Sequence, residues 1–262
     1  MQYTLSMRLL SGKSASLLFL AVLLSGTAWF VYGHLQPTIV YKAPPTPKED
    51  PLTSQGAAIE ETESQASSSV ASALPPRVVI QVPFASQAPL GDWGMPYQEA
   101  CEESSLILVH HYLTGEAMSP EIMDAEIRKM ADYEVNELGF HADTTAEETG
   151  LVAQKFYGHK ATVYYDITID DIKKQIAAGN PVIVPLAGRD IGNPYYSGLG
   201  PWYHMLVITG YDSKNFITND VGTKRGEGYK YPQQVLYEAI HDWTGAKENI
   251  RSGRKAMLVV TR

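Results

Sequence analysis

A change in composition near residue 76 limits where this chain can build a folded core. Residues 34–76 are rich in Pro, Ser and Glu and contain few bulky apolar side chains. Such a segment buries too little apolar surface to offset the conformational entropy that is lost on ordering. We therefore expect residues 34–76 to form a disordered stalk. The part of the chain that can build a core then lies in residues 77–262, which we predict to be a single domain.

A continuous apolar run without a charged residue lies before the stalk. It extends from Ala15 to Tyr32 and follows the positive residues Arg8 and Lys13. A helix of this length, at about 1.5 Å per residue, spans most of the hydrocarbon core of a bilayer. Positive charge ahead of the run predicts that residues 1–14 form a short cytoplasmic tail and that the rest of the chain is external.

The apolar run has two interpretations. We predict that residues 15–33 are a transmembrane signal anchor, because Trp29 to Tyr32 extend the run beyond the best cleavage site. The alternative is a cleaved signal peptide, for which Gly26 and Ala28 supply the small residues at the cleavage site. An anchor would make this a single-pass protein of the cell membrane with an extracytoplasmic domain, whereas cleavage would make the domain secreted.

Within residues 77–262 the predicted helices come first and most predicted strands follow. Ser119 before Pro120 is a helix start, and Gly179 before Asn180 is a helix end. Helices are expected at 102–113, from 119 onward, at 145–156 and at 170–179, and strands at 77–82, 181–186, 204–211, 215–220 and 257–261. Separate groups of helices and strands indicate an α+β fold rather than alternating parallel units.

The charge and the distribution of metal-binding residues argue against several classes of function. The formal net charge is −8, whereas nonspecific nucleic-acid binding needs clustered Lys and Arg. The sequence contains no glycine-rich phosphate loop. Its seven histidines are dispersed and it has one cysteine, so no pair of ligands has zinc-site spacing. We expect no nucleic-acid partner, no metal and no cofactor.

The single cysteine, Cys101, lies between a turn-rich loop and a predicted helix. A lone thiol forms no disulfide within the monomer. Backbone N–H groups at a helix N-terminus favour the thiolate, which is the nucleophilic form of cysteine. Cys101 is therefore a candidate nucleophile. The alternative is a small buried apolar residue, because free cysteine is among the residue types most often buried.

A cysteine nucleophile needs a base that accepts its proton and later protonates the leaving group, and histidine suits this role. His204 begins an otherwise apolar strand, which packing explains poorly. Asp220 ends the next strand, so in a hairpin it would lie beside His204 and orient the imidazole. Asn219 would then point to the opposite face. The alternatives are a core histidine bonded to a backbone carbonyl and a turn aspartate before Gly222.

Polar and aromatic residues near turns complete the set of candidates. Gln87, in the loop before Cys101, is a candidate donor to an oxyanion, together with the backbone N–H of Cys101. Trp93, Trp202 and Tyr203 are candidates for lining a substrate cleft, and core packing is the alternative for all three.

Two acidic residues follow the cysteine directly. Glu102 and Glu103 in the first turn of a helix complement the helix dipole. Negative charge beside Cys101 would nevertheless oppose formation of the thiolate. We therefore expect at least one of the two carboxylates to point away from the sulfur or to pair with a cation.

Several short motifs follow one another along the domain. They are Val82-Pro-Phe-Ala-Ser-Gln87, Asp92-Trp93, Ala100-Cys101-Glu102-Glu103-Ser104, His204 before an apolar strand and Gly210-Tyr-Asp, and Asn219-Asp220. In this order and spacing the sequence resembles the peptidase C39-like domains. These are relatives of the bacteriocin-processing leader peptidases and belong to the papain-like superfamily of cysteine peptidases. The resemblance covers about residues 78–262, and the order Gln, Cys, His, Asp is more specific than any one residue.

The resemblance implies a papain-like fold and a set of roles. A helical first half would place the nucleophile at a helix N-terminus, packed on an antiparallel sheet from the second half. Gln87 would be the oxyanion-hole residue, Cys101 the nucleophile, His204 the base and Asp220 the residue that orients the base. These four residues are the catalytic candidates of the chain.

The sequence also departs from the leader peptidases. Those enzymes usually have Gly after the cysteine and Pro after the aspartate, whereas Glu102 and Val221 occupy these places here. The chain therefore looks like the divergent C39-like branch. It carries no transporter core or ATP-binding cassette, so cleavage coupled to export is not implied.

Three functions compete at this point. The leading one is a membrane-anchored, extracytoplasmic cysteine hydrolase with a Cys-His-Asp triad that acts on peptide or related amide bonds. Its partners would be a peptide or protein substrate and, through the N-terminal helix, the membrane. The alternatives are a catalytically silent surface module that binds a peptide or glycan, and an acyl transferase of the transpeptidase or transglutaminase type. Hydrolysis and transfer use the same nucleophile and base, so the sequence does not separate them.

Overall fold

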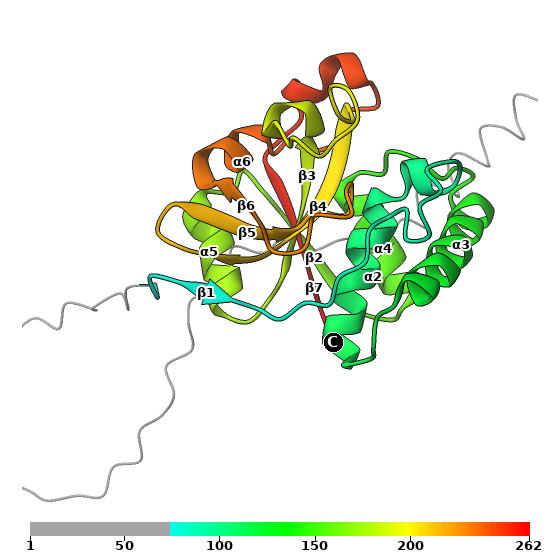
Figure 1. Ribbon diagram of the computed structural model, residues 1–262, viewed down its shortest axis with the longest axis horizontal. Helices are drawn as coiled ribbons and strands as arrows, with labels where there is room; N and C mark the ends of the chain where they lie inside the picture. The colour runs from blue at the N-terminus through cyan, green and yellow to red at the C-terminus, as the bar shows by residue number, and fades with distance from the viewer. Residues whose placement is uncertain (1–73) are drawn as a thin grey trace, which may run out of the picture. The chain divides into compact units, whose positions relative to one another are not determined.

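The computed structural model describes residues 74–262, which form an α+β fold (Figure 1). The helices are α2 (Cys101–Thr114), α3 (Pro120–Glu137), α4 (Ala146–Phe156), α5 (Ile169–Ala177) and α6 (Gln233–Ala239), with short 3-10 segments η1 (Tyr97–Glu99), η2 (Gly188–Ile191) and η3 (Lys247–Ser252). The strands are β1 (Val78–Val79), β2 (Lys160–Tyr165), β3 (Val182–Ala187), β4 (Tyr203–Tyr211), β5 (Asn215–Asn219), β6 (Tyr229–Pro232) and β7 (Ala256–Thr261).

The strands form one antiparallel sheet in the order β2-β7-β3-β4-β5-β6, with the short β1 also paired to β4. Every residue of β3 and β4 is buried, which fits two interior strands with apolar side chains on both faces. In the β3–β4 register His204 lies opposite Leu186. The first residues of β4 therefore sit beside the end of β3, well inside the sheet.

Helices cover both faces of the sheet. Figure 1 shows α2, α3 and α4 on one side and α5 and α6 on the other. Helix α2 packs on β4, and α4 packs on β2 and β7. Because α2 lies against the central strand β4, the N-terminal end of this helix is brought close to the residues that begin β4.

The helices begin in different ways. Ser119 caps α3 by accepting from the N–H of Ile122, and Thr145 with Glu148 forms a capping box at α4. Helix α2 is preceded by Ala100, whose side chain offers no acceptor. The first N–H groups of α2 are therefore left for other partners.

The structure confirms the α+β class, the helices expected around 102–113, 145–156 and 170–179, and the helix that starts at Ser119. It also contains a strand, β2, in a segment where the sequence predicted none. β2 precedes α5 and pairs along its whole length with the C-terminal β7, from Lys160 opposite Thr261 to Tyr165 opposite Ala256. Its run of Thr, Val and Tyr is typical of a strand.

The predictions of a cytoplasmic tail at 1–14 and an anchor at 15–33 lie outside the described residues, as does nearly all of the predicted stalk at 34–76. Within residues 74–262, none of the helices has the length and apolar character that crossing a membrane requires.

Candidate active site

Cys101 is the first residue of α2 and lines a cavity of about 800 Å³. The side chain is 7% exposed, and its Sγ accepts a hydrogen bond from the backbone N–H of Met205 at 3.4 Å. The sulfur therefore lies against the start of β4. Gln87 and His204 line the same cavity. The structure thus brings three of the four catalytic candidates to one cavity wall.

The fourth candidate lies behind His204. Nε2 of His204 is 2.9 Å from Oδ1 of Asp220, and both side chains are buried. Strands β4 and β5 pair as the predicted hairpin, with Val207 opposite Asn219, so the residue after β5 returns toward the start of β4. Among the described residues Nδ1 of His204 has no hydrogen-bond partner. This nitrogen is available to exchange a proton in the cavity.

Asp220 accepts hydrogen bonds on both carboxylate oxygens. Its donors besides His204 are Tyr196 and Gly222 to Oδ1 at 3.0 Å, and Asn193, Tyr196 and Tyr231 to Oδ2 at 2.9, 2.8 and 2.5 Å. Burial alone would raise the pKa of Asp220, but His204 and the two tyrosine hydroxyls lower it to about 2. Asp220 is therefore an anion held in a fixed orientation against the imidazole.

The geometry around Asp220 explains the residue types at two nearby positions, Asn219 and Gly222. Asn219 points away from His204, because its Nδ2 donates to the carbonyls of Val82 and Pro83 at 3.1 and 3.2 Å. The predicted opposite direction of this side chain is found. A Cβ on Gly222 would lie 2.9 Å from Cε1 of His204, so only glycine fits beside the imidazole.

Gln87 lines the cavity, but its amide has other partners. Nε2 donates to the carbonyls of Tyr97 and Gln98 at 2.9 and 3.3 Å, which ties Gln87 to the segment just before α2. Oε1 is buried and has no hydrogen-bond partner among the described residues. Donation to an oxyanion would require Nε2 to release one of these carbonyls, so this role stays a prediction.

The thiol of Cys101 faces a carboxylate. Sγ donates to Oε2 of Glu102 at 2.9 Å, and Oε1 of Glu102 accepts from the N–H of Thr144 at 3.0 Å. Burial and the charge of Glu102 raise the pKa of the Cys101 thiol well above its ordinary value, and only the Met205 N–H opposes them. The helix N-terminus alone would favour the thiolate of Cys101, whereas the buried carboxylate of Glu102 opposes its formation.

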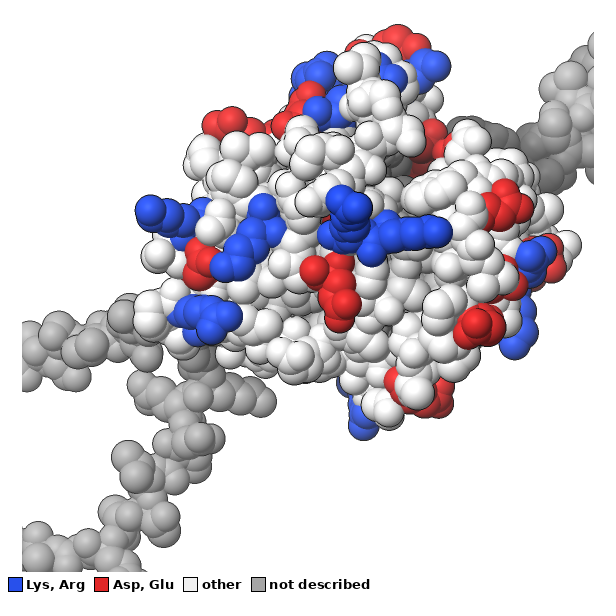
Figure 2. Space-filling view, in the orientation of Figure 1, with Lys and Arg blue, Asp and Glu red and all other residues white. Residues whose placement is uncertain are grey.

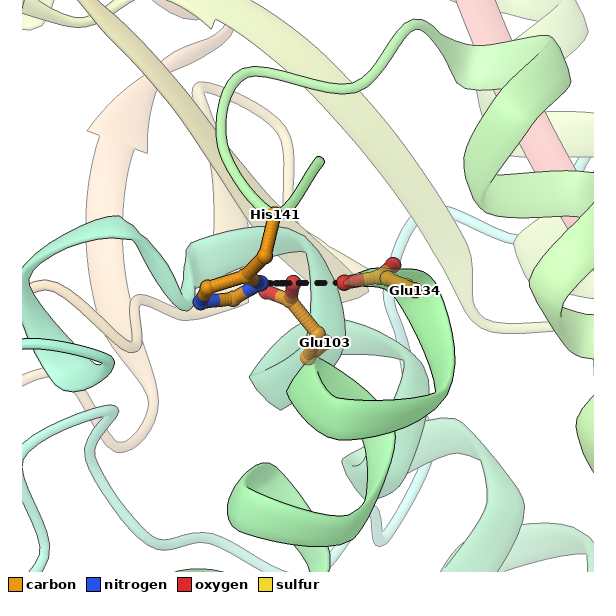
Figure 3. Close-up of side chains that lie close together, drawn as sticks. All are labelled: Glu103, Glu134 and His141. Atoms are coloured by element: carbon orange, nitrogen blue, oxygen red, sulfur yellow. Dashed lines mark hydrogen bonds and ion pairs between the residues drawn. The ribbon is translucent and has the colours of Figure 1, made fainter. Parts of the chain in front are cut away.

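Glu103 points in another direction and meets a cation (Figure 3). Nδ1 of His141 lies 2.6 Å from Oε1 of Glu103 and 3.0 Å from Oε2 of Glu134. Nε2 of His141 is 3.3 Å from the carbonyl of Pro96, so both ring nitrogens face acceptors. Burial opposes the charge of His141, but the two carboxylates raise its pKa to about 11. The expectation that one glutamate after the cysteine pairs with a cation is met by Glu103.

Glu103, Glu134 and His141 also bear on metal binding. Their donor atoms lie within 4.8 Å of one another, and His and carboxylate are ligands for divalent metals. The 2.6 Å separation of Nδ1 from the Glu103 oxygen is a hydrogen-bond distance, and protonated His141 already balances one of the two carboxylates. A proton on Nδ1 of His141, hydrogen-bonded to the carboxylates of Glu103 and Glu134, therefore accounts for the close approach of these three side chains.

The aromatic candidates divide between cavity wall and core. All three line the cavity, and Trp93 and Trp202 are 43% and 38% exposed. The guanidinium of Arg189 stacks on Trp202 with Cζ 3.6 Å from the ring centroid, which holds this indole in place. Tyr203 is buried, and its hydroxyl donates to the carbonyl of Thr144 at 2.7 Å. Trp93 and Trp202 fit a cleft, whereas Tyr203 mainly supports the loop before α4.

Side chains of both charge signs line the cavity. Lys224, Arg225 and Lys247 line it together with Glu99 and Asp143. Figure 2 shows lysine and arginine side chains grouped near the middle of the visible face, where the sheet side of the molecule meets α2. Burial and the charge of Glu99 raise the pKa of Asp143 to about 6. A bound substrate would thus meet both signs of charge.

Several residues of the site were not predicted. Tyr196, Tyr231 and Asn193 hold Asp220, and His141 pairs with both Glu103 and Glu134. Each lies in a segment distant in sequence from its partner, so no local spacing connects them. The Asn-Pro-Tyr-Tyr run at 193–196 was the one available signal, because turn residues beside two aromatics often carry function.

A comparison with protein-family models identifies the family. Residues 79–249 match the model of the Peptidase_C39 like family. No curated protein sequence matches the chain. A C39-like peptidase candidate from Bacillus anthracis shares 18% identity, with 71% of this chain and 98% of that chain covered and a TM-score of 0.47. Xylellain, a cysteine protease from Xylella fastidiosa, shares 15% identity, with 79% and 93% covered and a TM-score of 0.37.

Proposed function

Since the chain belongs to the Peptidase_C39 like family, we propose that it is a cysteine peptidase that hydrolyses peptide or related amide bonds at Cys101. The observation that carries the proposal is the shared cavity of Cys101 and His204, with Asp220 bonded to Nε2 of His204 at 2.9 Å. A nucleophile, a base and a fixed anion behind the base are the components of acyl transfer through a covalent intermediate.

The reaction proceeds in two halves. Sγ of Cys101 attacks the carbonyl carbon as the thiolate, after its S–H proton has been lost, and the imidazolium of His204 gives its proton from Nδ1 to the departing amine. The backbone N–H of Cys101, in the uncapped first turn of α2, stabilises the oxyanion, and Gln87 is the second candidate donor. Water, deprotonated by His204, then attacks the thioester and releases the acid. Asp220 keeps the imidazole oriented throughout.

The proposal includes a location. The charge pattern around the apolar run at residues 15–33 supports an extracytoplasmic domain attached to a cell membrane through its N-terminal segment. Fractionation of cells that express the full chain, followed by protease treatment of intact cells, tests this. Release of residues 77–262 from the cell surface is expected, and a domain protected inside the cell would contradict the location.

The activity is tested with the purified full-length chain and a mixture of peptides, analysed by mass spectrometry for new termini. Cys101→Ala is expected to abolish cleavage, and His204→Ala to lower the rate by about 10²–10⁴-fold because general acid–base catalysis is lost. His241→Ala is the matched control. It removes a half-buried imidazole that bonds the carbonyl of Gly253 and does not line the cavity.

The outcomes separate the competing functions. New termini that disappear in Cys101→Ala support a peptidase. Peptides joined to an added amine, with little free acid, would indicate acyl transfer by the same residues. Peptide binding without any covalent change, equal in the wild type and Cys101→Ala, would contradict the proposal and indicate a binding module.

A further inference from the structure

The thiol of Cys101 donates its hydrogen bond to the carboxylate of the next residue, at 2.9 Å. We propose that Glu102 is a proton acceptor for the nucleophile: Cys101 and Glu102 share one proton, which lies on Oε2 whenever Sγ is a thiolate. This inference rests on the proposed role of Cys101 as nucleophile. Glu102 stands where the leader peptidases usually have Gly, and the inference gives this departure a direct part in the chemistry.

The carboxyl group of Glu102 is held toward the sulfur. The side chain is 2% exposed, and its two oxygens have different partners: Oε2 faces Sγ, and Oε1 accepts from the N–H of Thr144 at 3.0 Å. Thr144 is fixed in turn, because its carbonyl accepts from the Tyr203 hydroxyl and its own hydroxyl bonds Thr149 at 2.9 Å. The Thr144 contact leaves Oε2 as the oxygen that exchanges a proton with the thiol.

The two adjacent glutamates differ in how their charge is balanced. Glu103 has His141, at 2.6 Å, although burial and the neighbouring Glu134 still raise the pKa of Glu103 well above its ordinary value. Glu102 forms no ion pair with any cation in residues 74–262, although it is equally buried. A buried carboxylate without a cation is stabilised by binding a proton. Burial and the charge of Glu103 accordingly raise the pKa of Glu102 to about 8.

Other ionisable groups surround Cys101 and Glu102. They are Glu103 on α2, Asp143 in the loop before α4, and Tyr203 and His204 at the start of β4. Burial and the charge of Glu102 raise the pKa of Tyr203 well above its ordinary value, so its hydroxyl stays neutral. The carboxylates of Glu103 and Asp143 both favour the protonated form of Glu102. His204 is the one group among these four that would favour the anion.

The proton transfer balances without a further reactant. The S–H bond breaks, an O–H bond forms on Oε2, and the pair carries one negative charge before and after. The neutral carboxyl group then donates its hydrogen bond to the thiolate, where the carboxylate had accepted one. Since Glu102 holds this proton, the departing amine receives a second proton, the one on the imidazolium of His204, which is restored when His204 deprotonates the water that attacks the thioester.

The test is the rate of alkylation of Cys101 by iodoacetamide as a function of pH. Because the full-length chain contains one cysteine, every alkylation event reports this sulfur. The measurement is made in the His204→Ala background, so that the imidazole in the same cavity does not contribute to the curve. Glu102→Gln is the test variant, since glutamine keeps the acceptor for Thr144 and loses the exchangeable proton. Glu99→Gln, which removes a cavity carboxylate without a bond to Sγ, is the matched control.

A shared proton predicts a curve with two steps. With Glu102 present, the rate rises with pH, flattens near the pKa of this residue at about 8, and rises again at higher pH. With Glu102→Gln the plateau disappears and the rate rises tenfold per pH unit through the same range. One pH unit above the start of the plateau, the Gln variant is then about tenfold faster. The Glu99→Gln control retains the plateau.

Two results would overturn the proposal. A single step that Glu102→Gln leaves unchanged would mean that the carboxylate does not interact with the thiol. A single step that moves to lower pH in Glu102→Gln would mean that Glu102 repels the thiolate without binding its proton.

A second measurement covers a variant that does not fold. The infrared difference spectrum of the wild type on alkylation should show a protonated carboxyl band that shifts, and its absence would also overturn the proposal. Alkylation needs no substrate, so a plateau without any peptide cleavage would leave this inference standing while the proposed function fails.

Discussion

At the scale of single residues, Asp220 decides what His204 can do. The carboxylate accepts from the imidazole, two tyrosine hydroxyls, an asparagine amide and a backbone N–H. Every donor in this set points at a carboxylate oxygen, and none accepts from Asp220. The pocket is therefore built for an anion, and an amide in the same place would set one N–H against a donor.

Asp220→Asn is expected to lower peptide cleavage by about 10²-fold or more, since the anion that stabilises the imidazolium is lost. The free energy of unfolding should fall by about 1–3 kcal/mol, because buried donors lose their acceptor. Rate assays and urea unfolding measure the two effects. Tyr231→Phe is the control: it removes one donor and keeps the charge, so it should cost about 1 kcal/mol and change the rate only a few-fold. Full activity in Asp220→Asn would contradict the orienting role.

The sequence predicted the pairing of His204 with Asp220, because alternation and a tight turn determine where a hairpin ends. It did not predict that Glu102 faces the sulfur. Adjacent residues on a helix point in different directions, and the direction here depends on the N–H of Thr144, 42 residues away along the chain. Contacts of this kind depend on tertiary structure.

At the scale of elements, the first turn of α2 is unusual in burying two glutamates. A helix N-terminus tolerates negative charge, but burial makes each uncompensated carboxylate costly. His141 offsets this cost for Glu103 and joins α2 to Glu134 of α3 (Figure 3). One imidazole from the loop that follows α3 thus adds to the packing on β4 that positions α2 and Cys101.

His141→Leu is expected to lower the free energy of unfolding by about 3–5 kcal/mol, because it leaves two buried carboxylates without a cation. Replacing all three residues with apolar ones, in Glu103→Met, Glu134→Met and His141→Leu together, should recover most of this loss, since no buried charge then remains. Chemical denaturation of the wild type, the single variant and the triple variant measures the difference. Equal stabilities for the single and triple variants would contradict the role of His141 as a counter-ion.

Most elements were predictable, and those missed have a common reason. Ser119-Pro120 and the Thr145 cap determine where helices begin, and buried apolar runs identify β3, β4 and β7. Strand β2 and the short β6 and α6 carry mixed polar and aromatic residues. β2 becomes a strand because β7, almost one hundred residues later, offers it a partner. A pairing of that sequence separation leaves no local pattern.

At the scale of the whole molecule, the buried acids and His141 should shape how stability depends on pH. Carboxylates whose pKa is raised bind protons in the folded chain that the unfolded chain has already released. Glu102, with a pKa raised from 4.5 to about 8, Asp143, raised from 3.8 to about 6, and Glu103, whose pKa burial and Glu134 raise well above its ordinary value, all belong to this group. Each contributes stability at low pH that is lost as the pH rises through its folded value.

His141 acts in the same direction, and Asp220 acts in the opposite one. The pKa of His141 rises from 6.5 to about 11 on folding, so its contribution is complete below pH 6.5 and declines as the pH rises toward 11. The pKa of Asp220 falls from 3.8 to about 2, so its contribution is present above pH 3.8 and disappears as the pH falls through 2. Together these groups place the maximum of the free energy of unfolding at a pH below 7.

We therefore expect the free energy of unfolding of the full chain to be highest near pH 4–5 and to decrease steadily between pH 5 and pH 8. Urea unfolding curves across this range measure it. Glu102→Gln should flatten the decrease, because a neutral amide releases no proton in either state, whereas Glu248→Gln, which removes an exposed carboxylate, should leave the slope as in the wild type. Stability that rises from pH 5 to pH 8, or a slope that Glu102→Gln does not change, would show that Glu102 is ionised in the folded chain at neutral pH. It would also remove the basis for a proton shared with Cys101.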